Sequence, residues 1–332
     1  MLERDGWDCI DGRRLGTMSN DGQCVRRPCR EQPDDQRRGN GDVYECRRHG
    51  AELTINDVFE WRETAGGRAL VCVALEPYAS HLFTTREWRL GAAGAGDRAP
   101  AWSELARAMG VDQANLARAH QVHGASVVVH RADQPQRVAE ALQQADVIVS
   151  DNPALAPAIQ AADCVPLLIA DRRTGVVAAA HAGWRGMAAR VPEVAVHALA
   201  REFGSRPADL IAVAGPSIGA CCYEVGADVR DAFRRGGFAD ALLAGWFFDA
   251  PQPTDRNPSM PGLPDIPRSH HWFFDGWAAT QDQLEEAGIP RHQIHIAGLC
   301  TASHSQLLCS YRRDGSSAGR LAAAIRRSHA AA

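Results

Sequence analysis

The chain has 332 residues, 45% of them hydrophobic, which is enough to bury a sizeable core in one large domain or two small ones. Its net charge of −4 gives no general attraction to nucleic acid. All 36 lysine-plus-arginine residues are arginine, which excludes a Schiff-base lysine, a pyridoxal-phosphate enzyme and a P-loop. Any phosphate must therefore be held by arginine or by backbone N–H groups.

The N-terminus has no apolar signal-peptide core, and no run approaches the roughly 18 apolar residues of a membrane span. We therefore expect a cytoplasmic protein with no membrane partner. In that compartment the ten cysteines are expected to be thiols rather than a disulfide framework.

Residues 1–50 differ in composition from the rest of the chain. They are rich in arginine, aspartate and glycine and have no helical or strand period. Their four cysteines and His49 lack the regular spacing of a zinc module. We expect a disordered extension, or a misassigned start codon, followed by one domain over residues 51–332.

Removing residues 1–50 is expected to leave the melting temperature and the activity unchanged. The segment has too few apolar side chains to offset the entropy lost on ordering it. Thermal unfolding of a chain that starts at Ala51 tests this directly. A large fall in melting temperature relative to the full chain would mean that the segment packs on the domain.

The hydrophobic pattern predicts interleaved strands and helices from residue 68 onward. Strands are expected at 68–75, 126–130, 147–150, 165–170, 176–180, 210–214 and 294–297, and helices at 101–109, 186–203, 226–235, 280–287 and 319–327. Residues 251–271 contain six prolines and are expected to form a surface loop. This order favours an α/β fold, a single mixed-sheet domain with helices packed on the outside.

Two apolar runs predict a β-hairpin. Val165–Ala170 and Val176–Ala180 are joined by a polar turn that ends at Gly175. Cys164 lies just before the first strand and His181 just after the second. Residues symmetric about such a turn face each other, so the hairpin brings Cys164 and His181 to the same end of the sheet.

A thiolate beside an imidazole suggests a metal centre, and the segment 120–124 supplies further imidazoles. One thiolate and two imidazoles can hold zinc with one coordination position left open. Zinc can polarise an oxygen and lower the pKa of water to roughly 7. Asp163, next to Cys164, is a candidate for orienting an imidazole or accepting a proton, with a structural hydrogen bond as the alternative.

Several motifs resemble those of a known family. They are Phe83-Thr84-Thr85-Arg86, Gln121-Val122-His123-Gly124, Ala145-Asp146-Val147, Gly215-Pro216-Ser217-Ile218-Gly219, Cys222-Tyr223-Glu224-Val225-Gly226, Cys300-Thr301, and Ser310-Tyr311-Arg312-Arg313-Asp314-Gly315 with Gly319-Arg320. From about residue 57 to the C-terminus they are similar to the laccase-domain or YfiH-type family. Its members were once labelled polyphenol oxidases and are now regarded as purine nucleoside phosphorylases.

The resemblance implies that His123, Cys164 and His181 are metal ligands and catalytic residues. It implies zinc as the metal, with copper as the alternative. It also implies phosphorolysis of adenosine, inosine, guanosine and methylthioadenosine, with adenosine deamination as a further activity. The partners are then purine nucleosides and phosphate, while the oligomeric state is left open.

Several side chains are candidates for holding the substrate. Arg185, counted among the catalytic residues, follows Trp184 near a predicted helix start, where a guanidinium and N–H groups suit an anion. The segment 215–219 follows a strand, and its N–H groups can bind phosphate or form a plain turn. The candidate substrate-binding residues are Thr85, Arg86, Ser217, Tyr311 and Arg312, each with a structural role as the alternative.

Three other functions use the same residues. Cys164 could act as a nucleophile with His181 as base in a hydrolase, for example one that edits peptidoglycan precursors. A copper polyphenol oxidase is disfavoured because the 13 histidines include no His-x-His pair. A non-catalytic metal-binding protein is disfavoured by the open coordination position.

Overall fold

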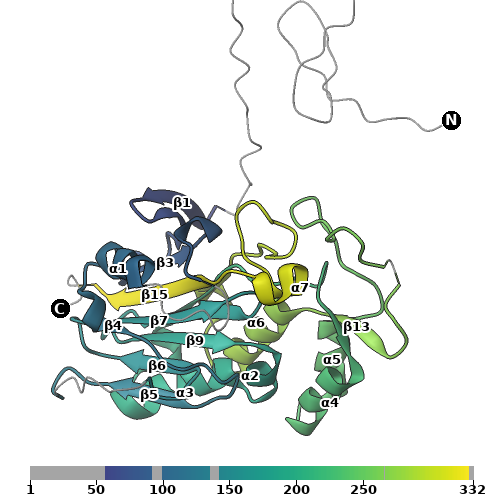
Figure 1. Ribbon diagram of the computed structural model, residues 1–332. Coiled ribbons are helices and arrows are strands. Elements are labelled where there is room, and N and C mark those ends of the chain that lie inside the picture. Colours follow the sequence, from purple (N-terminus) through teal and green to yellow (C-terminus); the bar gives the residue numbers. More distant parts are fainter. Residues whose placement is uncertain (1–56, 92–98, 135–141, 265, 329–332) are drawn as a thin grey trace, which may run out of the picture. The chain divides into compact units, whose positions relative to one another are not determined.

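The computed structural model describes residues 57–91, 99–134, 142–264 and 266–328 (Figure 1). The expected extension over 1–50 lies outside these ranges. Within them, none of the helices combines the length and the apolar character needed to cross a membrane.

The first of two six-stranded sheets has the strand order β1-β2-β3-β15-β7-β4. Its strands are β1 (Phe59–Thr64), β2 (Gly67–Cys72), β3 (Ala79–Thr84), β4 (Leu116–Ala117), β7 (Ala156–Ala161) and β15 (Leu321–Arg327). Neighbours run antiparallel except β4 and β7, which are parallel. The last strand of the chain thus lies in the middle of this sheet.

The second sheet has the order β14-β10-β8-β9-β6-β5. Its strands are β5 (Val127–His130), β6 (Val147–Ser150), β8 (Val165–Asp171), β9 (Val177–Ala182), β10 (Leu210–Ala214) and β14 (Ile294–Ile296). The pairs β10–β14 and β5–β6 are parallel, and the other pairs are antiparallel. A small third sheet joins β11 (Glu224–Gly226), β13 (His271–Phe274) and β12 (Phe247–Phe248).

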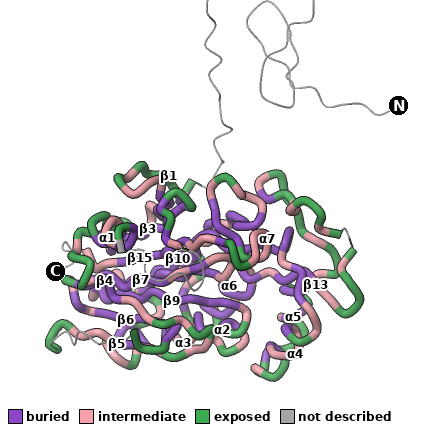
Figure 2. Tube along the Cα trace, viewed as in Figure 1, coloured by how far each residue is buried: buried purple, intermediate pink, exposed green. Residues whose placement is uncertain are grey.

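The two large sheets pack face to face. On β8, Leu168 and Ala170 point into a core shared with Phe83 of β3 and Ile159 of β7. The alternate residues of β8, such as Leu167, belong to a different core on the opposite face. Because side chains alternate along a strand, the central strands β6, β8, β9 and β10 contribute to both cores. Figure 2 shows the central strands β7, β9 and β15 as largely buried.

Helices cover the outer faces of both sheets (Figure 1). The helices of the described residues are α1 (Ala99–Ala108), α2 (Trp184–Ala188), α3 (Val191–Phe203), α4 (Ala227–Arg235), α5 (Asp240–Trp246), α6 (Gly276–Glu286) and α7 (Tyr311–Asp314), with 3-10 turns at Arg86–Trp88, Gln113–Asn115, Pro207–Asp209, Arg291–Gln293 and Gly315–Ser317. Side chains of α1 pack on the first sheet, and those of α3 and α6 on the second. The expected mixed-sheet α/β fold with outer helices is confirmed.

The helix predicted over 319–327 is wrong, because this segment forms β15. It lies between β3 and β7, with Ala323 paired to Phe83 on one side and to Ile159 on the other. Ala323 faces the second sheet, whereas Ala324 faces the core under α1. Burial on both faces between two strands overrides the helical propensity of alanine.

The long helix predicted over 186–203 is two helices, α2 and α3. The chain changes direction at Arg190, whose φ is 61°. Pro192 occupies the first turn of α3, where its missing N–H group costs no helical hydrogen bond. The break leaves α2 as a five-residue helix directly after the His181 segment.

Candidate metal centre

The predicted hairpin is present as β8 and β9. Its register pairs Val165 with Ala182 and Pro166 with His181. The register is therefore shifted by two residues from a direct pairing of Cys164 with His181. Cys164 still lies at the same end of the hairpin as His181, one residue before β8 begins.

Three side chains from separate segments meet at this end of the second sheet. One ligand atom from each of His123, Cys164 and His181 lies within 4.8 Å of the other two. The rings of His123 and His181 meet edge to face, with centroids 4.8 Å apart. His181 is buried, Cys164 is half-buried and His123 is exposed. The cluster is therefore open to solvent on the side of His123.

Asp146 organises two of these three residues, and the sequence prediction gave it no role. The side chain is fully buried at the start of β6. Its Oδ1 accepts hydrogen bonds from His181 Nδ1 at 2.8 Å and from the His123 backbone N–H at 3.0 Å. Its Oδ2 accepts from the N–H groups of Gly124 at 2.7 Å and Val122 at 3.2 Å.

The contact with Asp146 sets the orientation of the His181 ring. When Nδ1 donates to the carboxylate, Nε2 is left as an acceptor that can bind a metal. Burial raises the pKa of Asp146, but hydrogen bonds from His181 and Gly124 outweigh it and hold the pKa below its usual value. Asp146 therefore stays ionised and keeps the imidazole in place at neutral pH.

Asp163 does not orient either imidazole. Its carboxylate accepts the Thr301 hydroxyl at 2.6 Å and the Arg312 backbone N–H at 2.6 Å. Burial raises its pKa above the usual value, and these hydrogen bonds only partly oppose that effect. Asp163 therefore makes structural hydrogen bonds, which was the alternative interpretation. They link the Cys164 segment to two segments near the C-terminus.

Gly183 allows the thiol and the exposed imidazole to approach each other. A Cβ at this position would lie 2.9 Å from Cys164 Sγ and 3.0 Å from His123 Cδ2. Real Cβ atoms essentially never approach another heavy atom to less than 3.0 Å. The glycine in the His181 segment is thus a steric requirement of the cluster.

The charge state of the cluster differs from that of an isolated thiol and imidazole. Burial raises the pKa of Cys164, but the charge of His181 and hydrogen bonds from His123 and His181 lower it to about 6. Burial lowers the pKa of His181, whereas the Cys164 charge and the Asp146 hydrogen bond raise it to about 9. Without metal, the pair is a thiolate next to an imidazolium at neutral pH.

In metal-free protein, the Cys164 thiolate is expected to persist well below the ordinary range of a cysteine. Its folded pKa lies below its unfolded value, so the thiolate is present above about pH 6 and is lost as the pH falls through that value. Ultraviolet absorbance of the thiolate, taken as the difference between the wild type and Cys164→Ala, measures it. A difference signal that appears only above pH 8 would contradict the pairing with His181.

The donor set fits a zinc ion. Two imidazoles and one thiolate are ligands that zinc prefers, and three protein ligands with one open side are typical of catalytic zinc. The Asp146–His181 hydrogen bond is the second contact that metal-bound histidines commonly make. The exposed side at His123 leaves room for a substrate atom or a water molecule.

Arg185 and Arg312, which are distant in sequence, both lie near Tyr223. Both arginines are close enough to the half-buried Tyr223 to lower its pKa, and Cys164 is close enough to raise it, while burial raises it most. Arg312 Nη1 donates to the Glu224 carbonyl at 2.5 Å. Its guanidinium lies 5.0 Å from the Tyr223 ring centroid.

The Arg185 guanidinium is exposed and rests on the ring of Trp184, with Cζ 4.1 Å from its centroid. Among the described residues, no carboxylate lies within ion-pair distance of Arg185 or Arg312. This leaves both guanidinium groups able to pair with an anionic ligand. The five-residue α2 is too short to add a helix dipole to this anion contact.

Thr85 and Ser217 have partners inside the protein. The Thr85 hydroxyl donates to the Arg68 carbonyl at 2.8 Å, and Ser217 Oγ accepts the Trp277 indole N–H at 2.6 Å. Both residues are fully buried. The N–H groups of residues 215 and 217–219 donate to Pro166, Leu299, Asp163 and Cys300, respectively. The segment 215–219 is therefore a close-packed turn, and we do not assign it to phosphate.

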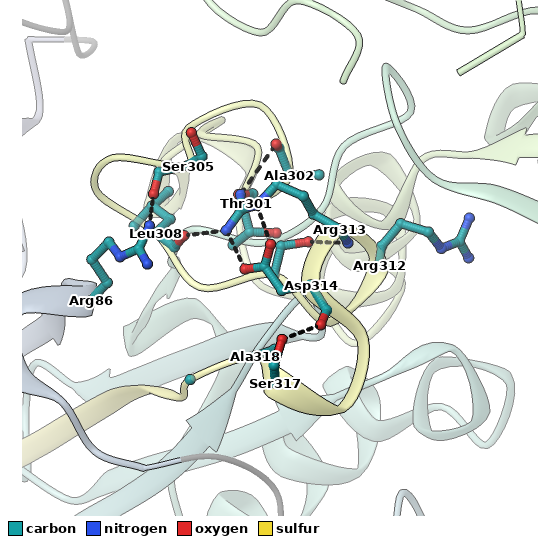
Figure 3. A network of polar contacts seen from close by, with 12 residues as sticks. Arg86, Thr301, Ala302, Ser305, Leu308, Arg312, Arg313, Asp314, Ser317 and Ala318 are labelled. Carbon is teal, nitrogen blue, oxygen red and sulfur yellow. Dashed lines mark hydrogen bonds and ion pairs between the residues drawn. The ribbon is translucent and has the colours of Figure 1, made fainter. Parts of the chain in front are cut away.

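The structure places Arg86 in a different hollow from the cluster. It lines a cavity of about 670 Å³ with Arg89, Arg313 and Asp314, among others, but with none of the three clustered residues. Arg86 also donates to the Ser305 carbonyl. In Figure 3 the Arg312 side chain points away from the network around Arg313. Tyr311, next to it, is 55% exposed, so its ring is free to contact a ligand.

Comparison with known proteins gives the evolutionary context of this centre. A family model described as multi-copper polyphenol oxidoreductase laccase matches residues 99–328, which include all three clustered residues. The chain belongs to this family. The resemblance drawn from the motifs is thereby confirmed.

Relatives in the laccase family carry two enzyme names. The purine nucleoside phosphorylase of Bacteroides thetaiotaomicron is 33% identical over 190 residues, which span 57% of this chain and 63% of that protein. An adenosine deaminase from an unknown prokaryotic organism is 30% identical over 220 residues, which span 65% of this chain and 76% of that protein. The crystal structure of the hypothetical protein YfiH from Bacillus licheniformis matches with a TM-score of 0.67 at 27% identity, covering 80% of this chain and 98% of that one.

Proposed function

We propose that the chain is a zinc-dependent purine nucleoside phosphorylase that also deaminates adenosine. The observation that carries the proposal is the cluster of His123, Cys164 and His181. Arg185 and Arg312 support it, because they and Cys164 all act on the pKa of Tyr223. The names of the relatives supply the substrate class, since nothing in the cluster itself selects a purine. Adenosine, inosine, guanosine and methylthioadenosine are the nucleosides that we expect.

His123, Cys164 and His181 would hold the zinc ion. When bound there, zinc supplies a Lewis acid that polarises an oxygen of the substrate or of water. Asp146 orients His181 and fixes the backbone of the His123 segment, so that both imidazoles are in place before substrate binds. Because the imidazoles are already oriented, they need to move less during the reaction.

Arg185 and Arg312 would bind the phosphate. Because the chain contains no lysine, guanidinium groups must supply the cationic contact. Tyr311 would stack on the base, since it is exposed and next to Arg312 in sequence. The phosphate would then be held on the side of the nucleoside from which it attacks the glycosidic carbon, with the base leaving on the other side.

The test is to incubate the protein with inosine in the presence and absence of phosphate. The proposal predicts hypoxanthine and ribose 1-phosphate only when phosphate is present, and conversion of adenosine to inosine without it. The His123→Ala variant should lose both activities. Release of hypoxanthine at the same rate without phosphate would contradict phosphorolysis and indicate a hydrolase.

A thiol hydrolase is the second candidate, because His181 lowers the pKa of Cys164 in metal-free protein. Such a pair could cleave an amide or ester, as in the editing of peptidoglycan precursors. Bound zinc would occupy the thiolate, so chelation separates the two functions. A chelator should abolish phosphorolysis, whereas it should increase hydrolysis by a free thiolate.

A further inference from the structure

A second cluster of sulfur atoms lies apart from the proposed zinc ligands. The Sγ atoms of Cys221, Cys222 and Cys300 all lie within 4.8 Å of one another, and all three residues are buried. Nothing in the proposed phosphorylase reaction uses them. A buried cysteine alone is usually a small apolar residue, but three sulfurs at one point form a potential ligand set.

Backbone pairing between two segments holds the three cysteines in place. Ser217 N–H donates to the Leu299 carbonyl, and Thr301 N–H donates to the Ser217 carbonyl, both at 3.1 Å. This bridge fixes Cys300 opposite the segment that continues to Cys221 and Cys222. The sulfur cluster is thus built on a paired backbone rather than on a free loop.

Two backbone N–H groups are directed at sulfur atoms of the cluster. Gly219 N–H donates to Cys300 Sγ at 3.4 Å, and Met260 N–H donates to Cys222 Sγ at 3.2 Å. An anionic sulfur is the form that binds a metal.

The surroundings favour a soft ion over a harder one. The apolar neighbours of the cluster include Ile218, Ala302 and the side chains of Met260, Tyr223 and Trp277. The nearest hydroxyl, Ser303 Oγ, lies 3.6 Å from both Cys221 Sγ and Cys222 Sγ. Among the described residues, no imidazole or carboxylate forms part of this cluster. Thiolate ligands suit monovalent copper, zinc and iron–sulfur clusters. Zinc prefers four ligands, so a set of three sulfurs fits monovalent copper better.

We propose that Cys221, Cys222 and Cys300 form a three-thiolate site for one monovalent copper ion, separate from the proposed zinc centre. Three sulfurs around one ion with metal–sulfur bonds of about 2.3 Å would be about 4 Å apart, so the observed separations need only small side-chain shifts. One hydrogen bond between sequence neighbours connects the copper site to the proposed zinc centre. Thr301 follows Cys300 and donates to Asp163, which precedes Cys164.

The test uses a full-length variant in which Cys164 and the four cysteines of residues 1–50 are replaced, so that they cannot bind copper. Its background carries Cys164→Ala, Cys9→Ser, Cys24→Ser, Cys29→Ser and Cys46→Ser. Under anaerobic, reducing conditions, monovalent copper is titrated against a chromophoric copper chelator. We expect about one copper ion per chain, and an excess of zinc should not displace it.

Adding Cys300→Ser to this background should weaken copper binding by more than about 100-fold, because even changes outside the ligand set cost about 10- to 100-fold. Cys309→Ser, which removes another buried thiol, is the matched control and should retain the copper. X-ray absorption of the copper-loaded background protein measures the ligands without relying on the folding of Cys300→Ser. Three sulfur ligands are expected. Binding of less than one copper, nitrogen or oxygen ligands, displacement by zinc, or a disulfide among the three cysteines would each overturn the proposal.

Discussion

Replacing Asp146 with alanine is expected to lower zinc affinity by at least about 10- to 100-fold. The substitution removes the acceptor of the His181 Nδ1–H bond and of three backbone N–H groups in the His123 segment. Each donor left unsatisfied in a buried site costs about 1–3 kcal/mol. The free energy of unfolding should therefore fall by at least about 3 kcal/mol.

Asp146→Asn separates the two effects. Asparagine keeps the size of the side chain and one carbonyl oxygen, so the variant should be more stable than Asp146→Ala. Its amide group removes the negative charge that fixes the His181 tautomer, so zinc affinity should still fall. Denaturant unfolding of the metal-free proteins and zinc competition with a chelator measure these quantities. Wild-type zinc affinity in both variants would show that Asp146 does not support the metal centre.

Arg185→Ala is expected to raise the apparent KM for phosphate about 10- to 150-fold, with a smaller effect on the KM for nucleoside. This range corresponds to the loss of about 1.5–3 kcal/mol from a charged hydrogen bond. The guanidinium is exposed and, among the described residues, has no carboxylate partner, so little of this loss should come from the fold. Adenosine deamination uses no phosphate and should be affected less in the same variant.

Arg201→Ala provides the matched control for Arg185. Arg201 is an exposed arginine on α3 that pairs with Glu202, and it is not part of the proposed site. Its replacement should leave both steady-state constants unchanged. Equal loss of phosphorolysis and deamination in Arg185→Ala would mean that this arginine supports the metal centre rather than phosphate.

Local pattern predicted the hairpin that carries two of the clustered residues. The apolar runs and the turn at Gly175 are contiguous, so Cys164 and His181 could be placed together without knowledge of the rest of the fold. The sequence did not determine the register, which differs by two residues. The position of His123 came from the family resemblance, because its segment is distant in sequence.

Asp146 illustrates what local pattern does not reveal. It precedes the apolar run of β6, and the β6–β9 register places Val147 opposite Ala180, which brings Asp146 next to His181. The sequence does show an acidic residue next to one apolar run and a histidine next to another, which is a possible sign of a carboxylate–histidine pair. Only the pairing of β6 with β9 shows that they meet.

The error at residues 319–327 has the same physical origin. An alanine-rich run favours a helix locally, and only its insertion between β3 and β7 decides for a strand. Ser217 shows the same limitation in the site, since its glycine-containing motif resembles a phosphate loop. Gly215 is required instead for close packing, because a Cβ there would lie 2.2 Å from the Phe83 ring.

The most direct test of a catalytic zinc centre is to titrate metal-free protein with zinc while measuring the phosphorolysis of inosine. We expect almost no rate without metal and a linear rise that levels off at about one zinc per chain. In Cys164→Ala the same additions should produce no comparable rise. Full activity in the metal-free wild type, or full zinc-dependent activity in Cys164→Ala, would contradict the assignment of His123, Cys164 and His181 as the ligands of a catalytic zinc ion.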